Sequence, residues 1–577
     1  METIQCNIAT SHVSLEQAIE RFWQTEQISS DSSLTTEERE CEAHYKENYR
    51  RTDDGHFIVK LPIKKNGLQT LGRSYDVALK RFHALENRLS RHPEMKTAYT
   101  QFMQEYIELG HMHPIKVDSQ ETTVSYYMPH HAVFKNTSTT TKTRVVFDAS
   151  CRTDTGVSLN DVLMVGPALQ PDLFSILIKF RMWKYVLSGD VTKMYRQILV
   201  DESQRRLQRI LWRDSKTREV QTFELATVTY GTASASFLAI RSLQEIARLE
   251  QDNAPVGASR ILSDFYVDDL LTGADSIEEL IKIRNQVNLI LGKAGFVLRK
   301  WASNEQAVLD DIPTMATDFI LNISENTSLH TLGLQWNSQD DMLQFDITVP
   351  RQSKITKRSI LSTIAHIFDP LGILGPIITT AKIFMQRLWE LKVDWDETLP
   401  SDIQTQWARY EAELPILNQV QISRKVIHYN NKELDLCGFA DASERAYGAC
   451  IYVRSKLSET QYKVNLLCAK SRVAPLKNLS LPRLELCAAL LLAQLMHKVL
   501  ESINITFAHV YYWSDSTIAL SWIKAPPRRW NTFVANRVSA IQDISDTNNW
   551  FYVHSSHNPA DIISRGMSPS LLLSTEL

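Results

Sequence analysis

Two adjacent carboxylates, Asp268 and Asp269, interrupt a short strand-forming region. The aromatic and β-branched run 265–267 precedes them and Leu270-Leu271 follows, so residues 264–270 are predicted to form strand, tight turn and strand. Neighbouring side chains on a regular strand point to opposite faces, but the tip of a hairpin can aim both carboxylates at one spot. Such a pair suits a hard divalent cation such as Mg²⁺, which takes oxygen ligands. A solvated turn is the alternative for this pair alone.

Other acidic residues stand where predicted elements end or begin. Three of them end strand-like apolar runs: Asp190, Asp441 and Asp515. Glu485 is expected in the first turn of a long buried helix opened by Pro482, and Asp561 follows His557-Asn558-Pro559-Ala560. Carboxylates in such places are frequent metal ligands, yet each also has a structural alternative as a helix cap, a turn residue or a complement to the helix dipole.

Basic residues gather on a predicted hairpin at 132–147. Its strand-like runs 132–135 and 143–147 flank a polar tip, and Lys135, Lys142 and Arg144 are basic with no acid among them. Lys142 and Arg144 are two residues apart and share one face of the strand. A cationic hairpin can hold a triphosphate or a nucleic-acid backbone. A solvated edge strand is the alternative.

Two more segments surround the candidate carboxylates. A strand is expected over 222–230, and small residues from Gly231 to Ser236 open a helix where a ligand or another backbone can approach closely. A further strand-like run, 295–301, contains Lys300. Amphipathic helices are predicted over 75–89 and 277–291 and from Pro93 to Gly110.

Composition places the chain among multidomain globular proteins. It has 577 residues, of which 44% are hydrophobic and 22% charged, and its net charge is -3. Nucleic-acid binding would therefore depend on local basic patches. The seven cysteines are spread without a Cys-x-x-Cys pair, which argues against a disulfide scaffold or zinc knuckle and fits a reducing compartment. No apolar run approaches the ~18 residues of a membrane span, and the first residues lack a secretory signal pattern.

These motifs together resemble those of a known family. Asp190, the Tyr230-Gly231 turn and residues 266–269 fall in the order and spacing of reverse transcriptase palm motifs. The segment 144–150 and Ser158-Leu159-Asn160-Asp161 resemble the polymerase of Bel/Pao-type LTR retrotransposons, and this resemblance covers nearly the whole chain from about residue 45. In the C-terminal part, the series Asp441, Glu485, Asp515 and Asp561 resembles ribonuclease H.

The resemblance implies a fragment of a pol polyprotein with a mixed α+β and α/β multidomain fold. The expected layout is a right-hand polymerase of fingers, palm and thumb, followed by a connection and a ribonuclease H-like domain. The expected divisions are an N-terminal extension at 1–74, fingers and palm at 75–305, primer grip, thumb and connection at 306–430, and the ribonuclease H-like domain at 431–577.

The resemblance also implies an activity and a set of site residues. It predicts an RNA-directed DNA polymerase that also cleaves the RNA of RNA–DNA hybrids, with two Mg²⁺ ions per active site and Mn²⁺ as a substitute. The catalytic and metal-binding residues would be Asp190, Asp268, Asp269, Asp441, Glu485, Asp515 and Asp561. The nucleotide-binding residues would be Lys135, Arg144, Tyr195, Tyr230, Gly231 and Lys300. His554 and His557 both qualify as the histidine of the ribonuclease H loop.

The expected partners are an RNA template, a DNA primer, their hybrid and deoxynucleoside triphosphates, with no membrane. The expected location is a cytoplasmic virus-like particle with access to the nucleus. Two other functions compete. A domesticated relic would bind nucleic acid without catalysis. An aspartic peptidase would use Asp441-Ala442-Ser443, because this region is also catalogued as a Pao aspartic peptidase; that chemistry needs two carboxylates and a Gly-bearing turn, and Ser443 stands in place of the glycine.

Overall fold

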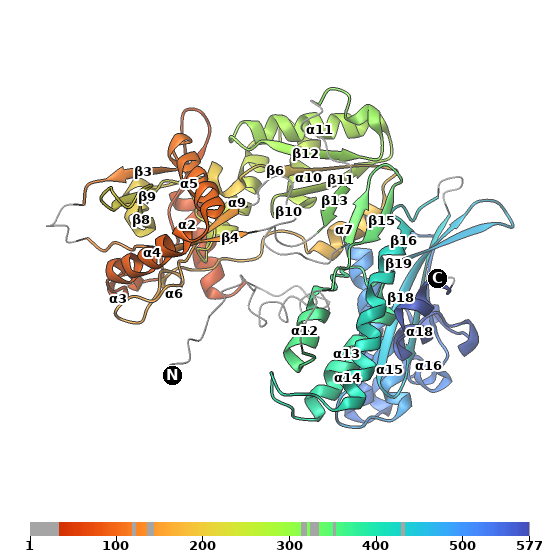
Figure 1. Cartoon of the computed structure of the whole chain (residues 1–577). Coiled ribbons are helices and arrows are strands. Elements are labelled where there is room, and N and C mark those ends of the chain that lie inside the picture. Colours follow the sequence, from red (N-terminus) through yellow and green to blue (C-terminus); the bar gives the residue numbers. More distant parts are fainter. Residues whose placement is uncertain are drawn as a thin grey trace.

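The computed structural model describes residues 34–117, 123–134, 143–312, 320–323, 334–349, 354–428 and 433–575. The described residues form three regions (Figure 1): a helix-rich N-terminal region, a central four-stranded sheet with its helices, and a C-terminal region built on a five-stranded sheet. The mixed α and β fold expected from the sequence is confirmed at this level.

The N-terminal region combines helices with short sheets. Its helices are α2 (Thr36–Asn48), α3 (Gly67–Thr70), α4 (Tyr75–Ser90), α5 (Pro93–Glu108), α6 (Leu159–Val162), α8 (Glu202–Arg205) and α9 (Ala235–Leu249). Its strands are β1 (Arg50–Arg51), β2 (Phe57–Val59), β3 (Met112–Ile115), β4 (His130–Phe134), β5 (Thr143–Phe147), β7 (Leu199–Val200), β8 (Arg209–Trp212) and β9 (Gln221–Leu225). They form sheets in the orders β1-β2-β7, β3-β9-β8 and β4-β5.

Local signals explain where several of these elements begin and end. The side chains of Thr35 and Glu38 form a capping box that starts α2. Pro93 occupies the first position of α5, where its missing N–H costs no helical bond, and Gly110 follows the helix with a positive φ of 68°. The strand predicted over 222–230 is wrong in its second half, because β9 ends at Leu225.

The central sheet has the order β10-β11-β6-β12. Its elements are α7 (Leu173–Met182), β6 (Tyr185–Val191), α10 (Pro255–Ser263), β10 (Phe265–Tyr266), β11 (Asp269–Ala274), α11 (Ile277–Gly292) and β12 (Leu298–Ser303). Strand β6 is central and antiparallel to both neighbours, and Leu187 and Gly189 on it are buried. The aromatic ring of Trp301 lies where a β-carbon on Gly189 would meet it at 3.0 Å, so the ring packs directly on the strand.

A second four-stranded sheet and three helices connect the central sheet to the C-terminal region. The sheet has the order β13-β14-β15-β16, with strands β13 (Ile320–Ile323), β14 (Leu334–Asn337), β15 (Met342–Phe345) and β16 (Gln421–Ser423). The helices are α12 (Lys357–His366), α13 (Gly375–Glu390) and α14 (Ser401–Glu413). Residues 324–333 of the expected primer-grip, thumb and connection region lie outside the described residues.

The C-terminal sheet has the order β19-β18-β17-β20-β21. Its strands are β17 (Leu434–Ala442), β18 (Ala446–Lys456), β19 (Tyr462–Val473), β20 (His509–Ser514) and β21 (Trp550–Tyr552). Its helices are α15 (Leu481–Ser502), α16 (Thr517–Lys524), α17 (Thr532–Ile544), α18 (Asp561–Arg565) and α19 (Pro569–Leu573). Gly438 faces α15, where an added β-carbon would lie 2.6 Å from Leu492 Cδ1, so helix and sheet pack closely.

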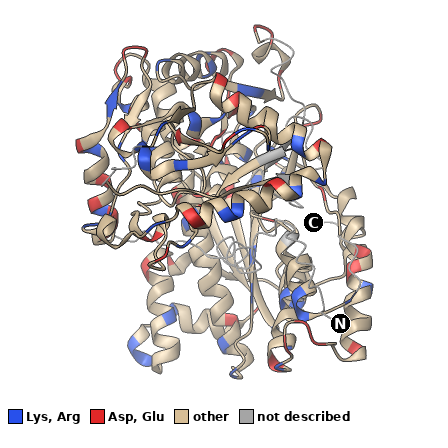
Figure 2. Cartoon of the chain, turned by 60° about the vertical axis from the view of Figure 1, so that its left-hand side comes forward, with Lys and Arg blue, Asp and Glu red and all other residues tan. Residues whose placement is uncertain are grey.

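Two large apolar cores hold the chain together. One joins the N-terminal region to most of the central sheet. The other runs from α7 through α12–α14 to the C-terminal sheet. Acidic and basic residues are interspersed along the ribbon (Figure 2), in keeping with the small net charge. Among the described helices, none is long and apolar enough to cross a lipid bilayer.

Two candidate metal centres

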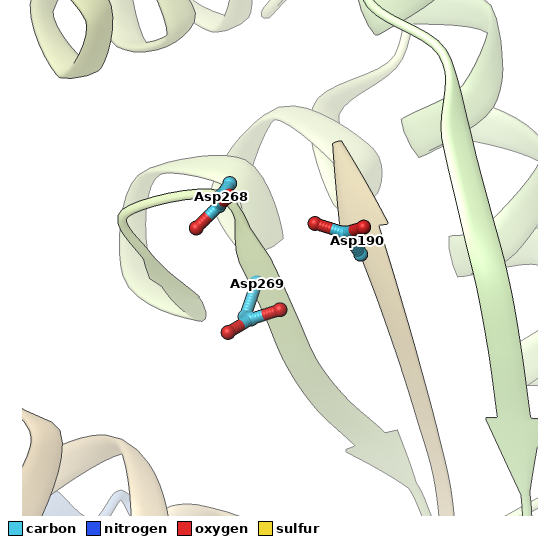
Figure 3. A group of neighbouring side chains, drawn as sticks. All are labelled: Asp190, Asp268 and Asp269. Carbon is cyan, nitrogen blue, oxygen red and sulfur yellow. The ribbon is translucent and has the colours of Figure 1, made fainter. Parts of the chain in front are cut away.

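The first candidate centre lies where β6 meets the β10–β11 hairpin. Tyr266 pairs with Asp269 across the hairpin, which leaves Val267 and Asp268 as the turn, and Val267 has a positive φ of 55°. Asp269 pairs with Asp190 on β6. Carboxylate oxygens of Asp190, Asp268 and Asp269 therefore all lie within 4.8 Å of one another (Figure 3). We call these three residues the hairpin cluster.

Two further contacts fix the hairpin against its surroundings. The backbone N–H of Val191 donates to the carbonyl of Asp268 at 2.8 Å. The backbone N–H of Val267 donates to Gln170 Oε1 at 2.7 Å. Sequence reasoning missed Gln170, since a glutamine in a loop nearly a hundred residues before the turn carries no local signal.

Lys300 supplies positive charge to the hairpin cluster. Its Nζ lies 2.9 Å from Asp190 Oδ2, and its side chain is 47% exposed. Burial raises the pKa of Asp269 well above its usual range, and the charges of Asp268 and Asp190 raise it further, while Lys300 opposes this rise. Burial lowers the pKa of Lys300, but the nearby Asp190 outweighs that effect and the net shift is upward. Lys300 thus partly neutralises three crowded carboxylates.

Two other predicted nucleotide-binding residues, Tyr195 and Tyr230, contact elements of the N-terminal region. Tyr195 lies in a 3₁₀ turn, Met194–Gln197, and its hydroxyl is 3.3 Å from Ser236 Oγ at the start of α9. Tyr230 donates its hydroxyl hydrogen to the carbonyl of Val145 on β5 at 2.6 Å.

Gly231 comes so close to the same hairpin that only glycine fits. Its φ is +101°, and an added β-carbon would lie 2.3 Å from the carbonyl oxygen of Phe147. Asn160 holds this turn from the other side, because its Nδ2 donates to the Gly231 carbonyl at 3.0 Å and its Oδ1 accepts from Ala233 N–H at 2.8 Å. Lys135 lies outside the described residues, and for Arg144 the structure describes only the backbone, in β5.

The second candidate centre lies at the ends of β17 and β20, against α15. These strands are parallel, with Ala440 beside Ser514, so Asp441 and Asp515 leave neighbouring strands side by side. Glu485 on α15 completes a group whose carboxylate oxygens all lie within 4.8 Å of one another. We call Asp441, Glu485 and Asp515 the C-terminal cluster.

Two structural alternatives for these acids are wrong. Helix α15 begins at Leu481, so Glu485 is in its second turn and not in the first, where it would complement the helix dipole. The cap of α16 is Ser516, whose side chain accepts from the Ala519 N–H, and not Asp515.

Burial dominates the electrostatics of the C-terminal cluster. It raises the pKa of Glu485 to about 9 and that of Asp441 to about 7, and the neighbouring carboxylates add to both shifts. The pKa of Asp515 is also raised by burial. Within the described part of the chain, Glu485 Oε2 is buried without a hydrogen-bond partner. Crowded acids with an unsatisfied buried oxygen fit a divalent cation, which would supply the missing positive charge and a partner for that oxygen.

Asp561 lies beside the C-terminal cluster without joining the group of three. It begins α18 and its Oδ1 accepts from Arg565 Nε at 2.7 Å. Ser564 on the same helix donates its hydroxyl hydrogen to Asp441, which links α18 to the cluster. Sequence reasoning missed Ser564 and Arg565. His554 and His557 both lie at a 3₁₀ turn, Ser555–His557, and both are exposed.

The sequence was compared with known families and proteins. A family described as the Pao retrotransposon-like RNaseH-like domain matches residues 356–516. Over residues 356–516, the resemblance to Bel/Pao-type retrotransposon proteins is confirmed. The matched Pao segment contains Asp441, Glu485 and Asp515 and ends before Asp561. No curated protein sequence matches the chain.

Solved structures of the foamy viral protease-reverse transcriptase are similar in outline. Its dRH form with double-stranded DNA is 14% identical with a TM-score of 0.49, and the match covers 80% of this chain and 70% of that one. A complex with an RNA/DNA hybrid has the same identity and TM-score, with coverages of 81% and 54%. For a further complex with double-stranded DNA these coverages are 80% and 83%, again at 14% identity and a TM-score of 0.49. The chain thus spans about half the length of the second structure.

Proposed function

We propose that this chain is an RNA-directed DNA polymerase that also cleaves the RNA strand of RNA–DNA hybrids. The observation that supports it best is the presence of two separate carboxylate clusters, each assembled from segments far apart in the sequence. Copying RNA leaves a hybrid whose RNA must be removed before a second DNA strand is made, so the two activities belong together in one chain.

Each cluster would hold divalent cations, Mg²⁺ or Mn²⁺. Asp190, Asp268 and Asp269 are the ligands at the first centre, and Asp441, Glu485 and Asp515 at the second, with Asp561 as a further ligand there. Bound cations at such sites activate an attacking oxygen and stabilise the leaving one in phosphoryl transfer. Asp561 would have to leave Arg565 in order to join the second centre.

The residues around the hairpin cluster would bind and orient the nucleotide. Lys300 lies 2.9 Å from Asp190, so its ammonium group would be beside a triphosphate held by a cation at the hairpin cluster. Lys135 and Arg144 are proposed to add positive charge there. Tyr195 would lie under the incoming sugar and exclude a 2′-hydroxyl by steric clash, which would select deoxynucleotides. The Tyr230-Gly231 turn would line the same site.

The finer organisation is part of the proposal. Fingers and palm would occupy 75–305, primer grip, thumb and connection 306–430, and the ribonuclease H-like domain 431–577, after an N-terminal extension at 1–74. The partners would be an RNA template, a DNA primer and their hybrid, which is recognised by shape, backbone and 2′-hydroxyl groups. The place of action would be a cytoplasmic virus-like particle, with access to the nucleus.

Primer extension and hybrid cleavage test this proposal. Purified protein should extend a DNA primer on an RNA template with Mg²⁺ or Mn²⁺, and should shorten the RNA of a preformed hybrid. Chelation should stop both. Nucleic-acid binding without either reaction would favour the domesticated relic. Metal-independent peptide cleavage lost on substitution of Asp441 would favour the aspartic peptidase, whereas the matching family is described as RNaseH-like.

A further inference from the structure

Helix α7 lies between the two carboxylate clusters. On one side it packs against β10 and β11, the hairpin that carries Asp268 and Asp269. On the other side it packs against α15, the helix that carries Glu485. Figure 1 shows α7 at the junction of the central and C-terminal regions. Its apolar residues Ile176, Leu177 and Phe180 belong to the core shared with the C-terminal sheet.

Arg181, near the end of α7, is bound entirely by backbone carbonyls of other elements. Its side chain is buried, with 2% of the residue exposed. Nη1 donates to the carbonyl of Leu467 on β19 at 2.5 Å, and Nε and Nη2 donate to the carbonyls of Arg424 and Ser423 at 3.1 Å each. One guanidinium thus ties the central region to the edge strand of the C-terminal sheet and to the end of β16.

A second buried arginine, Arg424, donates hydrogen bonds in the opposite direction, from the end of β16 to the end of α7. Arg424 donates from Nη1 to the carbonyls of Phe180 at 2.6 Å and Trp183 at 2.9 Å, at the end of α7. It also pairs with Asp341, at 2.6 Å from Nε to Oδ1. Neither arginine can leave its place without leaving several backbone carbonyls without their hydrogen-bond donors, which is unfavourable for carbonyls shielded from water.

The contact between α7 and α15 has polar links of its own. The hydroxyl of Ser502 donates to Ser175 Oγ at 2.9 Å in the buried interface. Lys498 Nζ lies 2.8 Å from Asp172 Oδ2, at the N-cap of α7. The loop that precedes α13 contacts β19, the edge strand that Arg181 also binds: the N–H of Ala469 on β19 donates to the Leu371 carbonyl at 2.8 Å.

We propose that α7 is a rigid spacer that fixes the separation of the two clusters, and that Arg181 is the positioning residue that locks it. The inference rests on the proposed function and adds a property to it. If the hybrid passes from the first centre to the second, a fixed spacer sets the number of base pairs between the primer end and the RNA cut. A C-terminal region that swung on a linker would cut at a broad range of distances.

A disulfide lock tests whether the contact persists during turnover. The double variant Ser175→Cys and Ser502→Cys should cross-link on mild oxidation, and each single cysteine variant is the control. The oxidised protein should retain extension and hybrid cleavage within about two-fold of its reduced form, with the same cut position. If the pair does not cross-link, or if oxidation abolishes an activity that reduction restores, the rigid spacer is wrong.

Removal of the guanidinium donors of Arg181 tests its role in holding α7. Arg181→Met keeps an apolar stem and removes the donors, and Lys498→Gln is a milder second variant for use if the first does not fold. On a recessed DNA primer annealed to labelled RNA, both should spread the RNA cuts over neighbouring positions, more so for Arg181→Met. Extension on a DNA template should be unchanged. Arg218→Met is the matched control, because the Arg218 side chain is 73% exposed and lies in the loop between β8 and β9 of the N-terminal region. Unchanged cut positions in folded Arg181→Met and Lys498→Gln would overturn the assignment.

The two tests separate this inference from the proposed function. Cross-linking reports on the contact between α7 and α15 and does not require enzymatic activity. A protein that cross-links fully but neither extends a primer nor cleaves a hybrid would confirm the contact between α7 and α15. It would contradict the proposed function, and with it the role of Arg181 in setting the cut position. A protein that performs both reactions but does not cross-link would support the proposed function and contradict the rigid spacer.

Discussion

The hairpin cluster and the C-terminal cluster gather the same chemical groups in different electrostatic settings. The hairpin cluster has a built-in counter-ion, Lys300, at 2.9 Å from Asp190. The C-terminal cluster has no lysine or arginine on its three acids among the described contacts; Arg565 binds the neighbouring Asp561 instead. Glu485 is 7% exposed, and its pKa is about 9.

This difference indicates that the two clusters tolerate the loss of metal unequally. A lysine held beside crowded carboxylates stabilises their charge when no cation is bound. Without such a group, the acids must take up protons or bind a cation. Both clusters contain an acid whose pKa is raised by burial, so the stability of both should depend on pH and metal. The C-terminal cluster, which lacks the lysine, should depend on them more.

The largest expected effect comes from loss of a ligand at the hairpin cluster. Asp268→Asn keeps the size of the side chain and removes one charge from the hairpin turn. DNA synthesis should fall by at least about 100-fold, the effect of removing one preorganised electrostatic group. The measurement is the single-nucleotide extension rate at saturating Mg²⁺. The variant should still cleave a preformed hybrid at the wild-type rate, and extension near the wild-type level would show that Asp268 is not a ligand.

The next effect concerns the stability of the metal-free C-terminal region. Because the folded pKa of Glu485 is raised from 4.5 to about 9, its favourable contribution is complete below pH 4.5 and is lost as pH rises toward 9. Asp441, raised from 3.8 to about 7, acts in the same direction at lower pH. Glu485→Gln should raise the free energy of unfolding at pH 8 without metal by a few kcal/mol; the 3.5 units from pH 4.5 to pH 8, at about 1.4 kcal/mol each, set an upper bound of about 5 kcal/mol.

Thermal unfolding in EDTA from pH 5 to pH 9 measures this effect. The wild-type midpoint should fall with rising pH, and added Mg²⁺ should restore it most strongly at the alkaline end. Glu485→Gln should show a flatter profile and a weaker response to Mg²⁺. A wild-type midpoint that rises over this range would contradict the raised pKa values.

A smaller effect is expected from Lys300→Met, which would make the hairpin cluster resemble the C-terminal one. The metal-free protein should lose less than about 1 kcal/mol at pH 8, because the ion pair is partly exposed. Its stability should also become more dependent on Mg²⁺. The exposed neighbour Arg299 provides the control variant Arg299→Met. Identical metal-free melting curves for both variants would show that Lys300 does not balance the cluster.

The smallest change in overall rate is expected at Tyr195. Tyr195→Val should raise kcat/KM for ribonucleotides relative to deoxynucleotides, because a ring that blocks a 2′-hydroxyl has been removed. The alternative is that Tyr195 serves only packing, in which case synthesis with both nucleotide types should fall together as stability falls. The ratio of kcat/KM for the two nucleotide types decides between these outcomes, with the melting temperature as a check on folding.

Local signals in the sequence predicted much of the fold. Pro93 at the start of α5 and the strand–turn–strand at 264–270 are both present, because each depends on a few neighbouring residues. The hairpin cluster was also accessible, since a turn between two short strands forces its carboxylates together. That Asp441, Glu485 and Asp515 meet could be expected from the resemblance and not from local pattern.

The remaining features depend on contacts between distant segments. Arg181 binds Leu467, and Lys300 binds Asp190, through pairings that no local pattern encodes. The ion pair of Asp561 with Arg565 depends on how α18 docks beside β17, which the sequence pattern does not specify. Burial also decides which acids have raised pKa values, and burial is a property of the assembled core.

The central claim is that the two clusters are separate centres with separate reactions. The most direct test is Glu485→Gln on a DNA primer annealed to RNA, with both strands labelled so that DNA lengthening and RNA shortening are followed in one reaction. The account predicts extension within about two-fold of wild type and RNA cleavage reduced by at least about 100-fold. Loss of both reactions in a folded variant, or RNA cleavage at the wild-type rate, would contradict it.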